Sequence, residues 1–403
     1  MKIALIAMPS NSDEPVAPPL LLAYVAALLE QRRHIVRIYD LAIRGSTSGT
    51  DRFASLRLYK PQVILLAGTD ARAAATIESE LITCGATILH LQADVRASGT
   101  IVSLAHMVQV LARGADGVNE QKVMIEALVA IDESLDNLPF PARHLLPLEK
   151  YPLITLDREL QTPIVIGRFL PGGRSELRHP MQIVAELRSI ASEHGIWHFQ
   201  FIGPDLTLDP GWTRNLLHLL TTARTGAAWE AGVAYDALTY DLLQLYRQAG
   251  CEGVLVRFDA LDVLADRDQR DRLQHAIQSA HAAGIKVRAQ IGLETRYSSM
   301  PVLVDLSATF GLDDVQFAVE SIAAPAATAG SQPEIESIAM LARQQYHTSR
   351  GRQYFVNRFG GYLGPILWRI GRTGMLGTTL RQIAAGGEWP DQITIEQQQR
   401  PTA

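Results

Sequence analysis

Short apolar runs alternate with longer helix-forming segments along the first third of the chain. The apolar runs predict buried strands at residues 2–7, 35–39, 63–67 and 87–91. The other segments predict helices at 19–31, 71–82, 101–111 and 122–131. Apolar strands separated by helices are typical of a parallel sheet covered on both faces. Ligands of such sheets bind beyond the carboxyl ends of the strands, so the candidate binding loops are 8–18, 68–72 and 92–100.

A proline-rich segment at 137–152 then interrupts the pattern. Its four prolines in sixteen residues exclude regular structure, and its apolar residues predict a packed linker. The alternation resumes with predicted strands at 164–168, 198–202, 228–233, 253–258, 287–291 and 315–319. Five helical segments lie between them, at 180–193, 211–223, 239–248, 265–283 and 299–310. This block is shorter than the roughly 250 residues of a full eight-stranded barrel, so it predicts a partial (β/α)6 barrel or a wide parallel sheet.

The chain is therefore predicted to be an α/β protein with four parts. A Rossmann-like domain spans 1–136, the linker 137–152, a partial barrel 153–325, and a C-terminal helical cap and tail 326–403. Within the last part, residues 362–370 predict an apolar helix packed on the barrel, with a partner- or membrane-touching helix as the alternative.

The charge balance limits the classes of partner. Lys and Arg number 37 and Asp and Glu 42, giving a net charge of −5. This balance argues against a nucleic-acid or membrane-surface protein, because both usually need a basic face. The apolar runs are too short for a signal peptide or a membrane span. The sequence therefore predicts a cytoplasmic protein with no nucleic-acid partner and no membrane span.

Cys84 and Cys251 are the only cysteines in the sequence. Two thiols exclude a disulfide scaffold and an all-cysteine zinc site. They also exclude an iron–sulfur cluster held by three or four thiolates of this chain. Both are predicted to be buried apolar residues.

Several segments resemble, in the same order, landmarks of cobalamin-binding-domain radical S-adenosylmethionine proteins. They are 17–29 (APPLLLAYVAALL), 33–40 (RHIVRIYD), 138–148 (LPFPARHLLPL), 178–180 (RHP), 198–209 (HFQFIGPDLTLD), 242–251 (LLQLYRQAGC) and 282–288 (AAGIKVR). The resemblance implies a Rossmann-like cobalamin domain followed by a radical-S-adenosylmethionine partial barrel. In that family the barrel holds a 4Fe–4S cluster on Cys-x3-Cys-x2-Cys, and the cluster cleaves S-adenosylmethionine for methyl transfer or ring chemistry.

This chain departs from the family's cluster motif. Alignment by the resemblance places Leu160, Ile164 and Gly167 at the three cysteine positions. Leu and Ile cannot ligate iron, so the chain is expected to be a degenerate member without an iron–sulfur cluster. Leu91-Gln92 replaces a Gly-Gly pair that would let the backbone approach the corrinoid.

A few polar residues at predicted strand ends are candidates for cofactor binding. Thr69 and Asp70 follow a buried strand and are predicted either to contact a cofactor or to cap the next helix. A barrel would bring the carboxylates of Asp205, Asp259 and Glu294 to one mouth, together with Glu320. There they would bind a ribose, an amine or a cation of a small-molecule ligand. The alternative is that they are solvated and bind nothing.

Three functions remain open from the sequence. The favoured one is a non-catalytic binding or scaffold subunit that acts with an active relative or its substrate, because the cluster ligands and the glycine turns are absent together. The second is a cluster-independent enzyme that uses cobalamin or S-adenosylmethionine for methyl transfer, with Asp205, Asp259 or Glu294 as base or cofactor ligand. The third is a cobalamin or tetrapyrrole carrier or sensor.

Overall fold

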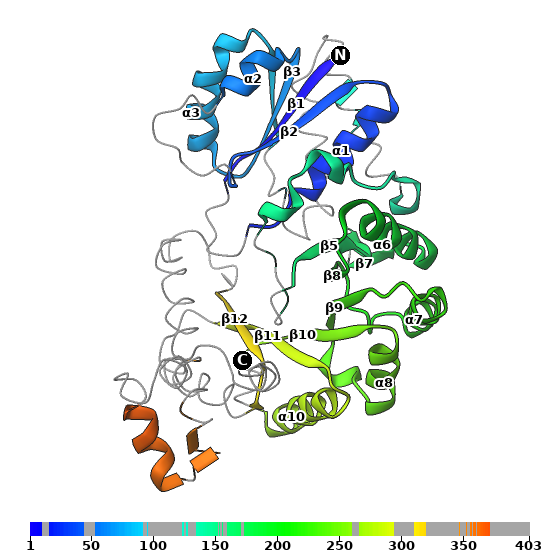
Figure 1. The fold of residues 1–403 in the computed structure, drawn as a ribbon, viewed down its shortest axis with the longest axis vertical. Coiled ribbons are helices and arrows are strands. Elements are labelled where there is room, and N and C mark those ends of the chain that lie inside the picture. The colour runs from blue at the N-terminus through cyan, green and yellow to red at the C-terminus, as the bar shows by residue number, and fades with distance from the viewer. Residues whose placement is uncertain are drawn as a thin grey trace, which may run out of the picture. The chain divides into compact units, whose positions relative to one another are not determined.

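The structure is a computed structural model in which two compact units can be described separately (Figure 1). One unit contains Met1–Gly232 and Gln248–Gly250, and the other contains Val233–Arg247 and Cys251–Ala403. The residues that the structure describes are 1–9, 16–43, 53–91, 95, 123–124, 126–127, 134–151, 153, 155, 159–170, 173–259, 266–293, 310–319, 346, 352, 355–356, 358–359 and 361–370.

The first unit begins with a four-stranded parallel sheet. Its strands are β1 (Lys2–Ala7), β2 (Ile35–Asp40), β3 (Val63–Ala67) and β4 (Thr87–Leu91), in the order β2-β1-β3-β4. The helices are α1 (Leu20–Gln31), α2 (Ala54–Tyr59) and α3 (Ala71–Leu81). All four strands predicted in this part of the chain are confirmed. The predicted helix 101–111 lies outside the described residues, and at 122–131 the four described residues are helical.

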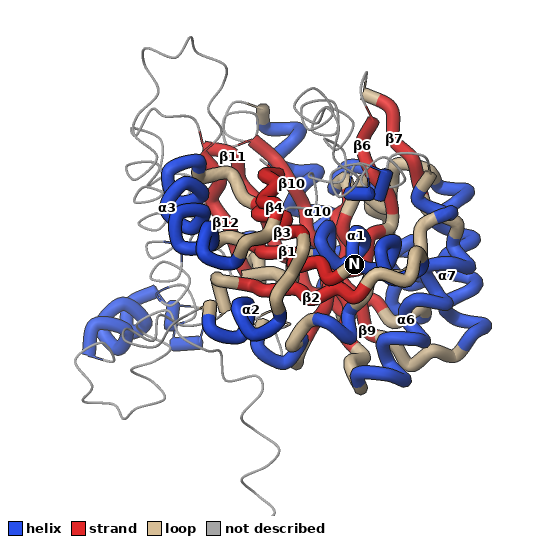
Figure 2. Tube along the Cα trace, turned by 90° about the horizontal axis from the view of Figure 1, so that it is seen from above, coloured by secondary structure: helices blue, strands red, loops and turns tan. Residues whose placement is uncertain are grey.

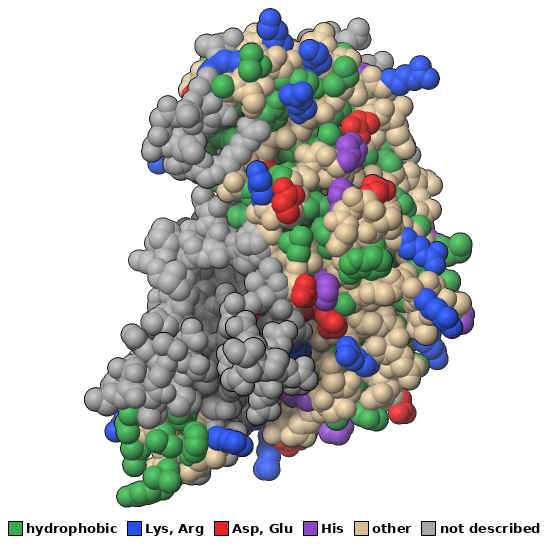
Figure 3. Space-filling model, viewed as in Figure 1, with side chains coloured by type: hydrophobic (Ala, Val, Ile, Leu, Met, Phe, Trp, Pro, Cys, Tyr) green, Lys and Arg blue, Asp and Glu red, His purple; other side chains and the backbone are tan. Residues whose placement is uncertain are grey.

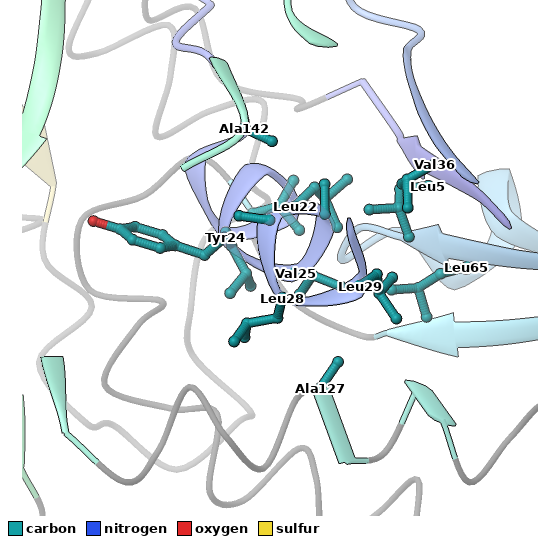
Figure 4. Close-up of a cluster of buried hydrophobic side chains, with 14 of the residues drawn as sticks. Leu5, Leu22, Tyr24, Val25, Leu28, Leu29, Val36, Leu65, Ala127 and Ala142 are labelled. Carbon is teal, nitrogen blue, oxygen red and sulfur yellow. The ribbon is translucent and has the colours of Figure 1, made fainter. Parts of the chain in front are cut away.

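Apolar side chains cover both faces of this sheet, as the continuous apolar strands predicted. Ile3, Leu5 and Ala7 pack with α1 in one buried cluster, while Ala4 and Ile6 belong to a second cluster with residues of α2 and α3. Every residue of α1 from Leu20 to Leu29 is buried. Figure 4 shows Leu22, Val25 and Leu29 of α1 pointing toward the strands, and Tyr24 pointing away from them on the opposite side of the helix.

The proline-rich linker packs against α1, as predicted. It forms short 3-10 turns at Leu135–Asn137, Arg143–Leu145 and Leu148–Lys150. Leu135, Leu138 and Ala142 join the buried cluster around α1, and the Ala142 amide donates to the Ala23 carbonyl at 2.9 Å. The Tyr151 hydroxyl donates to Asp40 Oδ2 at 3.0 Å, which fixes the end of the linker to the end of β2.

A second sheet has six strands in chain order. They are β5 (Gln161–Val165), β8 (His198–Ile202), β9 (Ala228–Val233), β10 (Cys251–Asp259), β11 (Lys286–Leu293) and β12 (Asp314–Val319), and the order is β12-β11-β10-β9-β8-β5. β5, β8 and β9 pair in parallel, as do β10, β11 and β12. The order is the one that the predicted partial barrel requires; closure into a barrel stays a prediction.

The helices of this part of the chain are α6 (Pro180–His194), α7 (Pro210–Ala223), α8 (Tyr240–Gln248) and α10 (Arg267–Ala282). Right-handed crossovers between strands in chain order place the connecting helices on one face. In the first unit, α6 and α7 lie side by side along one side of the strands (Figures 1 and 2). Among the described helices, none is long and apolar enough to cross a membrane.

One predicted strand differs from the structure. The run 164–168 was predicted as a single strand, but β5 ends at Val165 and the chain then turns into a hairpin. The hairpin consists of β6 (Gly167–Leu170) and β7 (Arg174–Leu177), which pair antiparallel. The apolar run continues through the turn because both β5 and the start of β6 are buried, so hydrophobicity alone does not mark the boundary.

Candidate functional site

The carboxyl edge of β5 and β8 is the candidate site in the first unit, since ligands of parallel sheets bind beyond the carboxyl ends of strands. The segment that follows β5 is the β6–β7 hairpin, and the segment that follows β8 begins with Gly203. The geometry of these two segments decides what this edge can hold.

A buried ion pair fixes the hairpin. Arg168 is 2% exposed and its Nε donates to Glu176 Oε2 at 2.6 Å across the two strands. The other carboxylate oxygen, Glu176 Oε1, accepts from the Leu135 amide at 3.1 Å. The hairpin is therefore tied to the linker through a charged group that already has two partners.

Two glycines close the gap between the hairpin and the end of β8. Gly203 has φ +133°, and a Cβ there would lie 2.5 Å from the Gly167 carbonyl oxygen. A Cβ on Gly167 would lie 2.6 Å from the Glu176 carbonyl oxygen. The backbones are in direct contact at this point, so no side chain fits between them.

Beside this edge, Glu186 of α6 bridges two buried arginines. Its Oε1 accepts from Arg143 Nη2 at 2.6 Å and its Oε2 from Arg178 Nη1 at 2.5 Å. The three side chains are 1%, 3% and 2% exposed, respectively. Such a buried cluster is stable only when each charge is paired and hydrogen-bonded.

The same arginines donate hydrogen bonds to carbonyl groups on the open edge of the sheet. In the described sheet β5 is a terminal strand that pairs only with β8. Arg143 Nη2 donates to the Pro163 carbonyl at 2.9 Å and Arg178 Nη1 to the Val165 carbonyl at 3.1 Å. Proline suits this position because an edge residue needs no amide donor. The cluster thus protects an edge that would otherwise offer unpaired backbone groups to another chain.

Electrostatics in the cluster follow from burial and from the excess of positive charge. Burial alone would raise the pKa of Glu186, but the attraction and hydrogen bonds of Arg178 and Arg143 outweigh it and hold the pKa below its ordinary value. Burial, reinforced by the negative charge of Glu186, raises the pKa of Tyr24 well above its ordinary value. The Tyr24 hydroxyl and two nitrogens of Arg143, Nε and Nη1, have no hydrogen-bond partner among the described residues.

The residues predicted at the edge of the first sheet have structural roles. Asp70 caps α3, and its Oδ1 accepts from the amides of Arg72 at 2.9 Å and Ala73 at 3.0 Å. Asp70 therefore has the capping role that the sequence offered, and a cofactor contact at Thr69 and Asp70 stays a prediction. Thr69 is exposed beside it. Gly68 packs on Met8, whose side chain occupies the space that a Cβ would need.

The predicted carboxylates fall on both units. Asp205 follows β8 and is half-buried, and its carbonyl accepts from the Leu208 amide at 3.0 Å. In the second unit, Asp259 is the last residue of β10 and pairs in register with Gly292 of β11. Its side chain lies outside the described structure, as do Glu294 and Glu320. The register nevertheless puts Asp259 and the chain that leads to Glu294 at the ends of adjacent strands.

The structure describes the three positions that the resemblance aligned with the cluster cysteines. Ile164 is fully buried inside β5, in register with Phe201, and Leu160 precedes that strand. Gly167 begins the β6–β7 hairpin, which follows β5 at the edge where ligands of parallel sheets bind. No residue of that hairpin is a cysteine. Among the described residues, no group of three or more His, Cys, Asp or Glu side chains could hold a metal ion.

Neither cysteine lies at this edge. Cys84 is half-buried at the end of the 3-10 turn Ile82–Cys84, which follows α3. Cys251 is fully buried at the amino end of β10, where its Sγ lies 3.3 Å from the Gly253 carbonyl oxygen. Cys251 is buried as predicted, whereas Cys84 is only half-buried.

Sequence reasoning missed the buried ionic groups: Arg143, Arg168, Glu176 and Glu186. A signal for Glu186 was present, because it lies three residues after Ile183 on a helix whose buried face includes Ile183, Leu187 and Ile190. A carboxylate on an apolar helix face indicates a buried partner.

Comparison with known proteins gives a fold likeness only. No protein-family model matches the chain, and no curated protein matches it. TsrM from Kitasatospora setae, a radical S-adenosylmethionine methyltransferase with cobalamin and a 4Fe–4S cluster bound, has a TM-score of 0.53 at 15% identity, covering 79% of this chain and 74% of that chain. TsrM with tryptophan substrate and aza-SAM bound gives 0.53 at 16%, with 78% and 72% covered.

OxsB, a cobalamin-dependent S-adenosylmethionine radical enzyme in its apo form, has a TM-score of 0.50 at 12% identity, covering 77% of this chain and 51% of that chain. The chain therefore has an α/β fold similar to that of cobalamin-dependent radical S-adenosylmethionine enzymes. This agrees with the family resemblance inferred from the sequence at the level of the fold.

Replacing Glu186 by glutamine should strongly destabilise the first unit. The variant leaves two buried guanidinium groups without a counter-charge, which costs about 3–5 kcal/mol of unfolding free energy. Urea unfolding followed by circular dichroism measures the loss. Glu193→Gln, an exposed site on the same helix, should change it by less than about 0.5 kcal/mol. Equal effects of the two variants would contradict the role given to the cluster.

The same cluster predicts a pH dependence. The folded-state pKa of Glu186 lies below its unfolded value, so its stabilisation is complete above the unfolded pKa and is lost as the pH falls through the folded pKa. The stability difference between the native chain and Glu186→Gln should therefore shrink as the pH falls below about 4.5. Urea midpoints at several pH values test this; a constant difference would argue against it.

Gly203→Ala should destabilise the chain more than Gly173→Ala does. Both glycines have positive φ, +133° and +75°, so both substitutions strain the backbone. Only at Gly203 does the added methyl group also overlap a backbone carbonyl, whereas nothing lies within 4 Å at Gly173. Gly203→Ala is expected to lower the unfolding free energy by about 1–3 kcal/mol more than Gly173→Ala does. If the two variants unfold alike, the close contact between Gly203 and Gly167 is not rigid.

Proposed function

We propose that this chain is a radical-S-adenosylmethionine-fold protein that has lost its cluster ligands and acts as a non-catalytic binding or scaffold subunit, together with an active relative or its substrate. The observation that carries the proposal is the β6–β7 hairpin. It stands where the cluster loop would follow the first strand of the barrel, and it is held by the Arg168–Glu176 ion pair instead of by cysteine thiolates.

The residues present do not fit an iron–sulfur cluster. Such a cluster needs three or four thiolates close together, and this sequence has two cysteines. Cys251 lies at the amino end of its strand, opposite to the edge where ligands bind, and Cys84 lies in the 3-10 turn between α3 and β4. No step of radical chemistry is therefore derived for this chain.

The described residues at the edge of the first sheet do not fit a corrinoid either. Close approach of a planar macrocycle needs backbone without protruding side chains. Here the Met8 side chain packs on Gly68, and Asp70 is engaged in capping α3. These contacts weigh against a cobalamin or tetrapyrrole carrier or sensor.

One observation favours a second candidate, a cluster-independent enzyme that uses S-adenosylmethionine for methyl transfer. The register of β10 and β11 places Asp259 beside Gly292, two residues before Glu294. Carboxylates at adjacent strand ends suit a ribose or an amine. In this alternative Asp259, Glu294 or Asp205 would hold S-adenosylmethionine or accept a proton from the substrate.

The domain division belongs to the same proposal. Residues 1–136 would form the Rossmann-like part, 137–152 the linker, 153–325 the barrel and 326–403 the C-terminal helical region. A small-molecule ligand would bind at the mouth of the barrel, and a protein partner would come from the same pathway.

Anaerobic reconstitution tests the proposal. The purified full chain is incubated with iron, sulfide and hydroxocobalamin, desalted, and examined by absorbance and metal analysis, beside a cysteine-containing radical S-adenosylmethionine enzyme treated identically. The expected result is a colourless protein without bound iron or cobalt. A brown protein with about four irons per chain would overturn the proposal, because a 4Fe–4S cluster requires them.

Calorimetry with S-adenosylmethionine separates the two candidates. The scaffold proposal predicts no binding heat and no turnover by the chain alone. Heat that is lost in Asp259→Ala but kept in Asp241→Ala, a carboxylate in the first turn of α8, would favour the enzyme instead.

A further inference from the structure

The charge of the chain is unevenly distributed along the sequence. Residues 337–387 contain no Asp, Glu or Lys, but they contain seven arginines: Arg343, Arg350, Arg352, Arg358, Arg369, Arg372 and Arg381. The other 352 residues carry 30 Lys and Arg against 42 Asp and Glu, a net charge of −12. The overall charge of −5 is therefore the sum of a segment with a charge of +7 and a remainder with a charge of −12. The net charge of the chain does not argue against binding of this segment to an anionic surface.

The helix at 361–370 in this segment exposes large apolar side chains. Tyr362 is 85% exposed, Leu363 54% and Ile366 46%, and Phe359 just before the helix is 40% exposed. Tyr362, Leu363 and Ile366 are one and four residues apart, so they lie on one side of this helix. Figure 3 shows a group of green side chains with blue ones beside it at the lower left, on the segment that Figure 1 draws in orange.

The opposite side of this helix is already packed. A Cβ on Gly364 would lie 2.5 Å from Val356 Cα and 2.6 Å from the Phe355 carbonyl oxygen, so the helix touches the preceding backbone there. Trp368 and Leu367 on the remaining sides are half-buried. Phe359 packs on Phe355 with ring centroids 5.8 Å apart, whereas Tyr362, Leu363 and Ile366 are exposed, so the predicted core packing of 362–370 does not describe these three side chains.

Two exposed arginines accompany these apolar side chains. Arg369 lies three residues after Ile366 and seven after Tyr362, so it is on the same side of the helix. Arg358 lies in the segment that precedes the helix. Exposed apolar side chains beside cations are typical of a helix that lies in the plane of a bilayer surface.

We propose that the exposed surface of this segment, formed by Tyr362, Leu363, Ile366 and Arg369 of the helix with Arg358 and Phe359 just before it, binds the surface of an anionic lipid bilayer. The apolar side chains would insert to the level of the headgroups, and the arginines would contact lipid phosphates. Anionic lipids complement a segment that carries only positive charge, and no acidic residue of the segment opposes the attraction. The binding is peripheral, since no described helix is long and apolar enough to cross a membrane.

Vesicle co-sedimentation with the full chain tests this proposal. The probes are phosphatidylcholine vesicles and phosphatidylcholine vesicles that contain about 30% phosphatidylglycerol, whose surface potential attracts basic segments. We expect binding to the anionic vesicles only, weakened by salt because exposed charges are screened. Arg358→Glu with Arg369→Glu should reduce the partition coefficient at least about 25-fold, since each arginine is worth roughly fivefold.

The apolar contribution is tested separately. Leu363→Glu with Ile366→Glu should reduce partitioning at least about tenfold, because the methylene groups that insert into the bilayer contribute to the binding free energy. The matched control is Leu58→Glu on α2, whose side chain is 83% exposed outside the basic segment and should leave partitioning unchanged. Circular dichroism confirms that each variant is folded.

Any outcome other than these expected results would overturn the proposal. Failure to bind anionic vesicles, equal binding to neutral vesicles, or binding unaffected by either double variant excludes this exposed surface as a lipid-binding site. Self-association that both double variants abolish, without vesicle binding, would instead assign the surface to a contact between copies of the chain. Binding only to an acidic protein would identify a protein partner.

Discussion

The open edge of strand β5 is the constraint on which the first unit depends. A terminal strand exposes carbonyl groups that must be hydrogen-bonded or hydrated. Here the guanidinium groups of Arg143 and Arg178 donate to the Pro163 and Val165 carbonyls. The Glu186 carboxylate forms an ion pair with each of them. Because Arg143 comes from the linker, Arg178 from the end of the hairpin and Glu186 from α6, a single cluster joins these three segments.

This cluster also determines the chemistry available at the carboxyl edge. Arg178 follows β7 directly, so fixing its side chain against Val165 fixes the base of the hairpin. At the other strand of the hairpin, Glu176 links Arg168 to the linker amide of Leu135. The Gly167–Gly203 contact fills the remaining gap. Charge pairing and backbone contact thus fill the carboxyl edge of β5 and β8.

The sequence predicted the strands well because most are short apolar runs, and such runs differ clearly from helices in length. It failed at the β5–β6 boundary, because burial continues through Ile166 while the chain direction changes. The role of Asp70 could be inferred from local spacing alone, since a cap involves residues two and three positions away. The cluster around Glu186 could not, because its partners lie 43 and 8 residues away and no local pattern connects them.

The carboxyl edge of β5 and β8 is closed by contacts that depend on one another. A buried arginine without its carboxylate costs several kcal/mol, so Arg168 needs Glu176, and Glu176 in turn accepts from the linker amide of Leu135. The positive φ of Gly203 allows the backbone after β8 to meet Gly167 at the start of the hairpin. Loss of either contact would therefore loosen the hairpin that closes this edge.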